Sequence, residues 1–178
     1  QTLHVRERIS GLLIGNKTNY HFKNGQLHRD NDEPAIVYNN GHMEYYQHGK
    51  LHRDNDKPAV VHISGDKEYY QHGDRHRENG PAVECVNGYC VYYRHNKHHR
   101  EDGPAVIYSN GDKTYYQNDK LHRVDGPAVE NANGDKQYYQ HGKRHRMDGP
   151  AVEHANGYRA YFIDDKLHRE GGLPAIES

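Results

Sequence analysis

Histidine and arginine occur together at a fixed spacing along this 178-residue chain, and both side chains can do chemistry. The dipeptide His-Arg occurs seven times, and a Pro-Ala pair follows each arginine four or five residues later. A guanidinium group carries five N–H donors in a fixed fork, so a row of them would suit phosphates or another polyanion. We call this series the arginine column: Arg29, Arg53, Arg77, Arg100, Arg123, Arg146 and Arg169.

Aspartates close to these arginines offer a structural alternative that needs no ligand. In most repeats one aspartate follows its arginine by two or three residues, ahead of the proline. An Arg–Asp ion pair there would brace the turn before the Pro-Ala pair, and we favour this interpretation. The aspartates concerned are Asp32, Asp56, Asp102, Asp125 and Asp148.

The pattern predicts neither a metal centre nor a catalytic site. Equivalent histidines of a hairpin array lie two strands apart, about 9.5 Å, whereas zinc needs its ligands about 2.0–2.1 Å from one centre. A catalytic site is usually a single arrangement, and this chain repeats its polar residues in every unit. We therefore expect a protein that is not an enzyme and that binds no cofactor.

The composition limits the class of partner. The net charge is −1 with histidine neutral, so the chain has no overall positive field to attract nucleic acid. No apolar run approaches the roughly 20 residues of a transmembrane helix. Only 33% of the residues are hydrophobic, and the 16 tyrosines must supply much of the apolar surface.

The spacing of the repeats predicts the fold. A period of 23 or 24 residues indicates a repeat array, in which each unit buries apolar surface against its neighbours. Asn110-Gly111 favours a two-residue type I′ turn between strands at residues 105–108 and 113–116. We predict an all-β fold: an antiparallel β-hairpin repeat array of about seven units, joined into one elongated twisted sheet.

The predicted turn decides which side chains share a face, because side chains alternate along a strand. It pairs Val106 with Tyr115 on one face and leaves Ala105 with Tyr116 on the other. We expect the valine face to be better buried and the alanine face to form a shallow aromatic groove. The predicted binding surface combines the arginine column with the second tyrosine of each Tyr-Tyr pair: Tyr46, Tyr70, Tyr93, Tyr116 and Tyr139.

Cys85 and Cys90 flank another Asn-Gly step and would face each other across its hairpin. Directly opposed Cα atoms would be about 4.5 Å apart, at the short end of the disulfide range. A disulfide and a pair of reduced thiols are both compatible with this spacing. The loop that a disulfide would close is too short to add much stability.

The phrase Tyr-Tyr-Gln-His-Gly-Lys-Leu at residues 45–51 resembles the second variety of the MORN repeat family. His52 matches that family's aromatic-x-x-Gly-x-x-His spacing, and the resemblance spans residues 22–176. Arg replaces the Gly that commonly follows the histidine, and Tyr replaces Trp. The resemblance implies hairpins aligned in a long twisted sheet, and a scaffold that associates with proteins or lipids without catalysis by the repeats. A fainter similarity, to the Tyr-Asp repeats of large secreted shell proteins, has a Tyr-to-Gly spacing one residue too short.

We expect residues 1–20 to form a capping segment and residues 21–178 to form the MORN-like array. The apolar stretches at residues 3–5 and 11–14 would make an atypical first hairpin. Residues 173–176 would form a strand with an open edge, which suits strand addition from another chain.

The predicted function is a non-enzymatic repeat scaffold for protein binding, or for self-assembly into a fibre or homo-oligomer. The alternative is a polyanion or phospholipid binder that uses the arginine column at acidic pH, where the 17 histidines become protonated. A protein partner or a second copy of the chain is expected, peripheral lipid contact is the membrane option, and nucleic acid is not expected. The sequence does not indicate a compartment.

Overall fold

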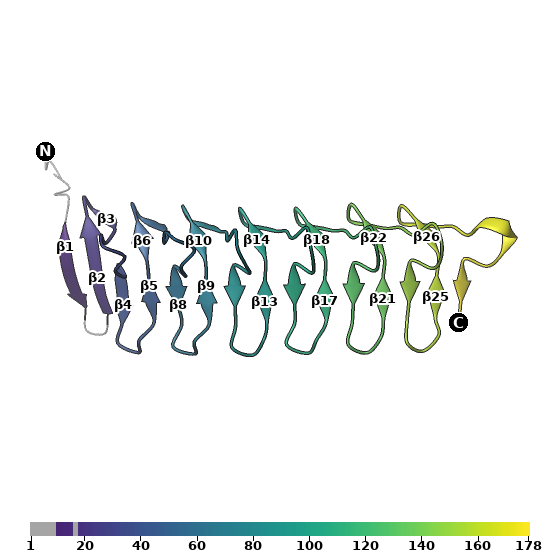
Figure 1. Cartoon of the computed structure of the whole chain (residues 1–178), viewed down its shortest axis with the longest axis horizontal. Helices are drawn as coiled ribbons and strands as arrows, with labels where there is room; N and C mark the ends of the chain where they lie inside the picture. The colour runs from purple at the N-terminus through teal and green to yellow at the C-terminus, as the bar shows by residue number, and fades with distance from the viewer. Residues whose placement is uncertain (1–9, 16–17) are drawn as a thin grey trace, which may run out of the picture. The chain divides into compact units, whose positions relative to one another are not determined.

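The computed structural model describes residues 10–15 and 18–178, and it confirms an all-β antiparallel hairpin array (Figure 1). Its strands follow one hydrogen-bonded order through a 16-stranded sheet, and six further pairs form separate two-stranded sheets. The only helical element among these residues is a single 3-10 turn, η1 (Glu170–Gly172). The predicted segment at residues 3–5 lies outside the described residues.

The chain divides into two compact units, residues 1–86 and residues 87–178. In the first unit, the strands of the main sheet follow the order β1-β2-β4-β5-β8-β9-β12. The strands of this unit are β1 (Gly11–Gly15), β2 (Thr18–Lys23), β3 (Gln26–Leu27), β4 (Ile36–Tyr38), β5 (Met43–Glu44), β6 (Tyr46–Gln47), β7 (Lys50–Leu51), β8 (Val60–Val61), β9 (Lys67–Glu68), β10 (Tyr70–Gln71), β11 (Asp74–Arg75) and β12 (Val83–Glu84).

In the second unit, the main sheet follows the order β13-β16-β17-β20-β21-β24-β25-β28. The strands of this unit are β13 (Cys90–Val91), β14 (Tyr93–Arg94), β15 (Lys97–His98), β16 (Val106–Ile107), β17 (Lys113–Thr114), β18 (Tyr116–Gln117), β19 (Lys120–Leu121), β20 (Val129–Glu130), β21 (Lys136–Gln137), β22 (Tyr139–Gln140), β23 (Lys143–Arg144), β24 (Val152–Glu153), β25 (Arg159–Ala160), β26 (Phe162–Ile163), β27 (Lys166–Leu167) and β28 (Ile176–Glu177).

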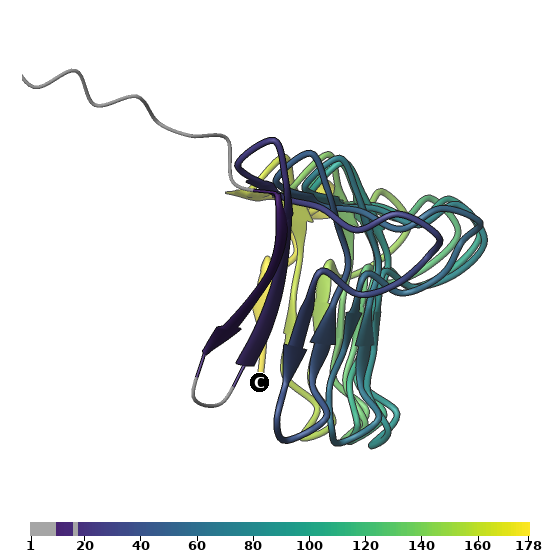
Figure 2. The same cartoon turned by 90° about the vertical axis from the view of Figure 1, so that its left-hand side faces the viewer.

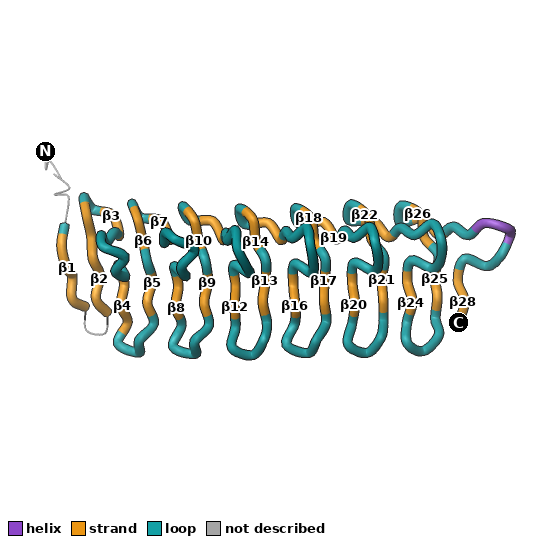
Figure 3. The backbone as a smooth tube through the Cα atoms, in the orientation of Figure 1, coloured by secondary structure: helices purple, strands orange, loops and turns teal. Residues whose placement is uncertain are grey.

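Each repeat contains two hairpins rather than the single one that was predicted, and Figure 3 shows their strands in orange. In one repeat of the second unit, β16 pairs with β17 in the main sheet, and β18 then pairs with β19 in a small sheet of its own. The small sheets of neighbouring repeats are joined by backbone hydrogen bonds. The N–H of Asp119 donates to the carbonyl of His98 at 3.0 Å, and the N–H of Arg100 donates to the carbonyl of Tyr116 at 3.1 Å. Backbone hydrogen bonds therefore join consecutive repeats both in the main sheet and between the small sheets.

The predicted type I′ turn at Asn110-Gly111 is wrong. Val106 lies opposite Thr114, not Tyr115, because the loop has three residues, 109–111. Only its last residue, Gly111, is left-handed, with φ +92°. Its N–H donates to the carbonyl of Tyr108 at 2.9 Å. A type I turn followed by a left-handed glycine is the common three-residue hairpin, and it uses the same Asn-Gly step.

The tight two-residue turns lie instead in the second hairpin of each repeat. His48 and Gly49 are both left-handed, with φ 51° and 76°. His72 and His141 take the same conformation as the first residue of their turns. A type I′ turn needs positive φ at both central residues, so these histidines are held in a conformation that few non-glycine residues adopt.

The change of register exchanges the two faces, because a shift of one residue moves every side chain to the other side. Ala105 shares a face with Tyr115, and Val106 shares the opposite face with Thr114 and Tyr116. The alanines are the most buried of the described residues, so the prediction that the valine face is better buried is wrong. Ala35, Ala59, Ala82, Ala105, Ala128 and Ala151 are each 0% exposed.

The loops that carry the arginine column lie against the alanine face. In Figure 2 the strands of the main sheet run down to their turns, while the returning loops project from one side of each repeat. At the start of the sheet, β1 pairs with β2, and β2 pairs with β4, so the first described hairpin continues the array. The last strand in the order, β28, pairs with β25.

Candidate binding surface

Six of the seven arginines of the column lie over the ring of a tyrosine eight residues earlier, and in five of the six this tyrosine is the first of a Tyr-Tyr pair. The Cζ atom of Arg123 is 4.0 Å from the ring centroid of Tyr115. Its Nη1 donates to the carbonyl of Pro127 at 3.2 Å and to the carboxylate of Glu130. Six repeats share the stacking, with distances of 3.6–4.0 Å: Arg53–Tyr45, Arg77–Tyr69, Arg100–Tyr92, Arg123–Tyr115, Arg146–Tyr138 and Arg169–Tyr161.

Every arginine of the column also has a carboxylate partner, and side-chain exposure ranges from 16% to 31%. The predicted Arg–Asp pair occurs within a repeat at Arg100–Asp102, and between neighbouring repeats at Arg53–Asp32. The hydrogen bond from Arg100 holds the pKa of Asp102 below its usual value. The guanidinium groups thus link the return loop to the sheet.

Among the histidines that precede these arginines, Nδ1 accepts a backbone hydrogen bond from the next repeat at His28, His52, His99 and His122. Nδ1 of His52 accepts the backbone N–H of His72 at 3.0 Å, while Nε2 lies 3.0 Å from Asp54 Oδ1. The two imidazole rings stack with centroids 4.4 Å apart. In the second unit, Nδ1 of His122 accepts the N–H of His141 at 3.1 Å. A nitrogen that accepts a hydrogen bond carries no proton, so this contact requires the neutral imidazole.

The second tyrosines lie on the opposite face from the arginine column, so the two predicted parts of the binding surface do not form one surface. Tyr70 donates to Glu68 at 2.8 Å, Tyr46 donates to Glu44, and Tyr139 donates to Gln137. Burial first, and then the hydrogen bond to Glu68, raise the pKa of Tyr70 to about 12. All five second tyrosines are half-buried.

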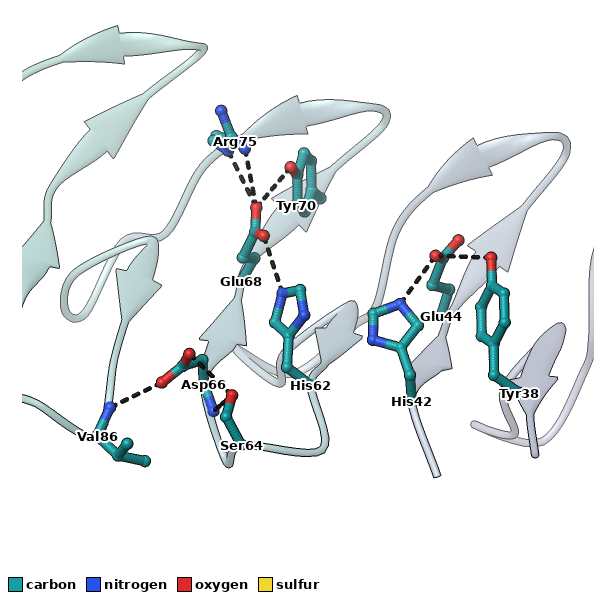
Figure 4. Close-up of polar contacts among 10 residues, drawn as sticks. All are labelled: Tyr38, His42, Glu44, His62, Ser64, Asp66, Glu68, Tyr70, Arg75 and Val86. Carbon is teal, nitrogen blue, oxygen red and sulfur yellow. Dashed lines mark hydrogen bonds and ion pairs between the residues drawn. The ribbon is translucent and has the colours of Figure 1, made fainter. Parts of the chain in front are cut away.

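Two glutamates organise this face in the first unit, as Figure 4 shows. Glu68 accepts hydrogen bonds from Tyr70, from His62 at 3.0 Å and from Arg75 at 3.0 Å. Burial opposes its ionisation, but these donors outweigh burial and lower its pKa. Glu44 likewise lies 3.0 Å from Nε2 of His42. The two carboxylates thus join tyrosine, histidine and arginine side chains into one polar layer on this face.

Clefts lie between successive return loops on the alanine side. In the second unit, two of them have volumes of about 520 and 510 Å³. Each has a loop on either wall, together with a stacked tyrosine, a proline and a glutamine. The first is lined by Arg123, Val124, Asp125, Gly126, Pro127, Tyr138, Gln140, His145, Arg146, Met147 and Asp148, and the second by the equivalent residues one repeat earlier.

Two apolar side chains of these loops point to solvent. Val124 is 72% exposed and Met147 is 76% exposed, at the position between Arg and Asp where other repeats carry Asp or Glu. The side-chain amides of Gln117 and Gln140 line the clefts, and neither has a hydrogen-bond partner within the part of the chain that the structure describes. Sequence reasoning missed these clefts, although the constant Tyr-to-Arg spacing could have indicated the stacking that builds them.

The first unit has a smaller cleft of about 330 Å³, lined by residues of the loops at 28–33 and 52–54. Its glutamine, Gln47, donates to Asp54 at 2.9 Å and is therefore already paired. These loops belong to the 24-residue repeats and contain the left-handed residues Asn31 and Asp32. The extra residue makes the loop, and with it the cleft, different from those of the second unit.

Cys85 follows β12 in the first unit and Cys90 begins β13 in the second, and both are half-buried. The disulfide stays a prediction. Within the described ranges, no group of three or more His, Cys, Asp or Glu side chains converges as a metal site would require. No helix in the described part of the chain is long and apolar enough to cross a bilayer.

No protein-family model matches the chain, and no curated protein sequence matches it.

Proposed function

We propose that the chain is a non-enzymatic repeat scaffold that binds a protein partner along the clefts of its second unit. The observation that carries this proposal is the recurrence of one cleft in consecutive repeats, each with an exposed apolar side chain at its rim. A surface that repeats suits an extended partner, because each repeat adds one more equivalent contact. The resemblance to MORN repeats supports a scaffold role.

The side chains of the clefts are of the kinds that dominate protein interfaces. Tyrosine and arginine are enriched among residues that contribute most to binding, and methionine is enriched at interface cores. Tyr138 and Arg146 are already held in one geometry by their stacking at 4.0 Å. A preorganised site loses less side-chain entropy on binding. Burial of Val124 and Met147 by a partner would contribute favourably to the free energy of binding, because both side chains are largely exposed.

The polyanion alternative draws less support from this geometry. Each arginine of the column already has a carboxylate acceptor, and each donates to the carbonyl of its own Pro-Ala segment. A phosphate would have to displace these acceptors. Heparin retention that weakens with salt and strengthens below about pH 6.5 would favour the polyanion alternative instead.

A random peptide library displayed on phage would test the proposal against the immobilised full chain. We expect sequences to be enriched on the wild type and lost on Met147→Asp, which places a charge at the rim of a cleft. Ile63→Asp is the matched control, because Ile63 is similarly exposed, at 71%, but lies in a turn of the main sheet. Light scattering over a dilution series reports self-association of the same preparation.

Enrichment that is equal on the wild type and on Met147→Asp would show that the clefts do not bind peptides. Failure to enrich any sequence would count against the proposal as a whole. Loss of binding on Ile63→Asp as well would place the surface elsewhere.

A further inference from the structure

We propose that the partner segment is a left-handed polyproline-II helix that runs along the return loops of the second unit, one turn per repeat. This inference rests on the proposed function and names the class of peptide that the clefts would take.

The first argument is the distance between equivalent clefts. Equivalent strands of consecutive repeats, such as β16 and β20, are separated by one strand, β17. Neighbouring strands lie about 4.7–4.9 Å apart, so one repeat advances by about 9.4–9.8 Å. The loop end keeps this period, because the N–H of Arg123 donates to the carbonyl of Tyr139 at 3.1 Å, as Arg100 does to Tyr116.

Only one regular peptide conformation matches this period. A polyproline-II helix has three residues per turn and rises about 3.1 Å per residue, so it presents the same side every 9.3 Å or so. A β-strand presents the same side about every 6.6–6.8 Å. An α-helix does so after about 10.8 Å, two turns of 5.4 Å, and would be out of step by at least 1 Å per repeat.

The second argument is the hydrogen-bonding capacity of the clefts. A polyproline-II segment makes no internal hydrogen bonds, so its carbonyl groups are available to donors. Gln117 and Gln140 place one amide donor in each cleft, and neither amide has a partner among the described residues. One glutamine per repeat would meet one peptide carbonyl per turn.

The third argument is the shape and charge of the walls. Proline-rich segments bind in grooves lined by aromatic side chains, and each cleft is lined by a tyrosine, Tyr115 or Tyr138, together with the arginine stacked over its ring. Val124 and Met147 provide apolar contact at the rims. Asp148 is already paired with Arg146, but the exposed carboxylate of Asp125 lines both clefts and would attract a cation. The expected ligand therefore has proline or an aliphatic residue at every third position and lysine or arginine between them.

The first unit is predicted not to bind this ligand. The amide of Gln47 is paired with Asp54, the cleft is smaller, and its loops carry polar residues where Val124 and Met147 stand. The two units thus provide an internal comparison within one chain.

Fluorescence anisotropy with a labelled twelve-residue peptide of four Lys-Pro-Pro triplets tests the inference on the full chain. The reference is a peptide of the same composition in which the prolines do not keep the period of three. We expect the periodic peptide to bind at least tenfold more tightly, since the reference cannot place equivalent residues in consecutive clefts. Gln140→Ala should weaken binding about threefold to tenfold, the value of one hydrogen bond. Lys120→Ala, an exposed change on the small sheet, should have no effect.

Equal affinity for the two peptides, or unchanged affinity in Gln140→Ala that melts like the wild type, would overturn the inference. A phage selection that yields cleft-dependent peptides without a proline period would also overturn it, while leaving the proposed function in place. A selection that yields no cleft-dependent peptide would remove the proposed function itself. If Gln140→Ala melts earlier than the wild type, Gln117→Ala in the neighbouring cleft gives the same test.

Discussion

The arginines of the column are the residues that hold the return loops against the sheet. Arg123 lies over the ring of Tyr115 and also donates to the carbonyl of Pro127 and to Glu130. A planar cation is needed for all of these contacts at once, because stacking and forked donation both use the guanidinium plane. The residue most suggestive of ligand binding in the sequence is thus engaged within its own repeat.

Arg123→Lys should lower the free energy of unfolding by about 1–2 kcal/mol, because lysine keeps the charge but loses the stacking and a forked hydrogen bond. Urea unfolding followed by tyrosine fluorescence measures this. Arg159→Lys, at an exposed position in β25, is the control and should be neutral. Equal stability of Arg123→Lys and the wild type would show that charge alone accounts for the role of Arg123.

Where the proline follows its arginine by four residues, the glycine before the proline leaves room for the guanidinium group of that loop's own arginine. A Cβ at Gly103 would lie 2.9 Å from Cζ of Arg100. Gly103→Ala should therefore cost about 1–3 kcal/mol by displacing the guanidinium. The cost should fall in an Arg100→Ala background, where nothing obstructs the methyl group. A double-mutant cycle in urea would give a coupling near zero if the glycine acts only through the backbone.

At the scale of the element, the neutral histidines join one hairpin to the next. Burial, and then the positive charge of His141 when protonated, lower the pKa of His122. Its Nδ1 is occupied by the backbone N–H of His141, and no other charged group is an identified contributor to its shift. The unfolded chain therefore takes up a proton more readily than the folded chain. The stabilisation from neutral His122 is full above about pH 6.5 and is lost as the pH falls through the lower folded pKa.

His122→Asn should flatten this part of the pH dependence, because the asparagine oxygen can accept the same N–H without titrating. Urea midpoints between pH 5 and pH 8 compare the variant with the wild type. We expect the wild type to lose stability on acidification faster than the variant. If the urea midpoints of the variant and the wild type fall equally as the pH is lowered, other histidines account for the whole loss of stability.

The hairpin elements were predictable from the sequence, but their register was not. An Asn-Gly step fits a two-residue turn and also a three-residue loop whose last residue is a left-handed glycine. These alternatives differ by one residue, so the choice exchanges the faces, and Tyr115 joins Ala105 instead of Val106. The arginine stacking was missed because it depends on which tyrosine shares the alanine face. The second hairpin was missed because the predicted unit had one hairpin in one continuous sheet, whereas β18 and β19 form a two-stranded sheet of their own.

The burial of the alanines follows from the stacking of arginine over tyrosine on the alanine face. Ala128 lies opposite Tyr115, whose ring is covered by Arg123, and it is 0% exposed. Ala128→Leu should destabilise the chain by about 1–3 kcal/mol through overpacking. Ala132→Leu, in an exposed turn, serves as the control and should change the urea midpoint little. A neutral result at Ala128 would mean that the return loop can move away without cost.

At the scale of the whole molecule, stability should be distributed by repeat. Contacts in a repeat array join neighbours only, so a local change weakens nearby repeats most. Hydrogen exchange followed by mass spectrometry on Arg123→Lys should show lost protection mainly at residues 92–165, and little change before residue 86. Uniform loss of protection over both units would contradict this and show that the chain unfolds as one cooperative body.

The arginine contacts have a consequence for how such a chain can change in length. Tyr115, Arg123, Pro127 and Glu130 lie within 16 consecutive positions, so one stretch of sequence encodes the complete set. A tandem duplication of 23 codons would copy a complete repeat together with the contacts that hold its return loop to the sheet. Lengthening by recombination therefore needs no compensating substitution elsewhere, and each added module brings one further cleft.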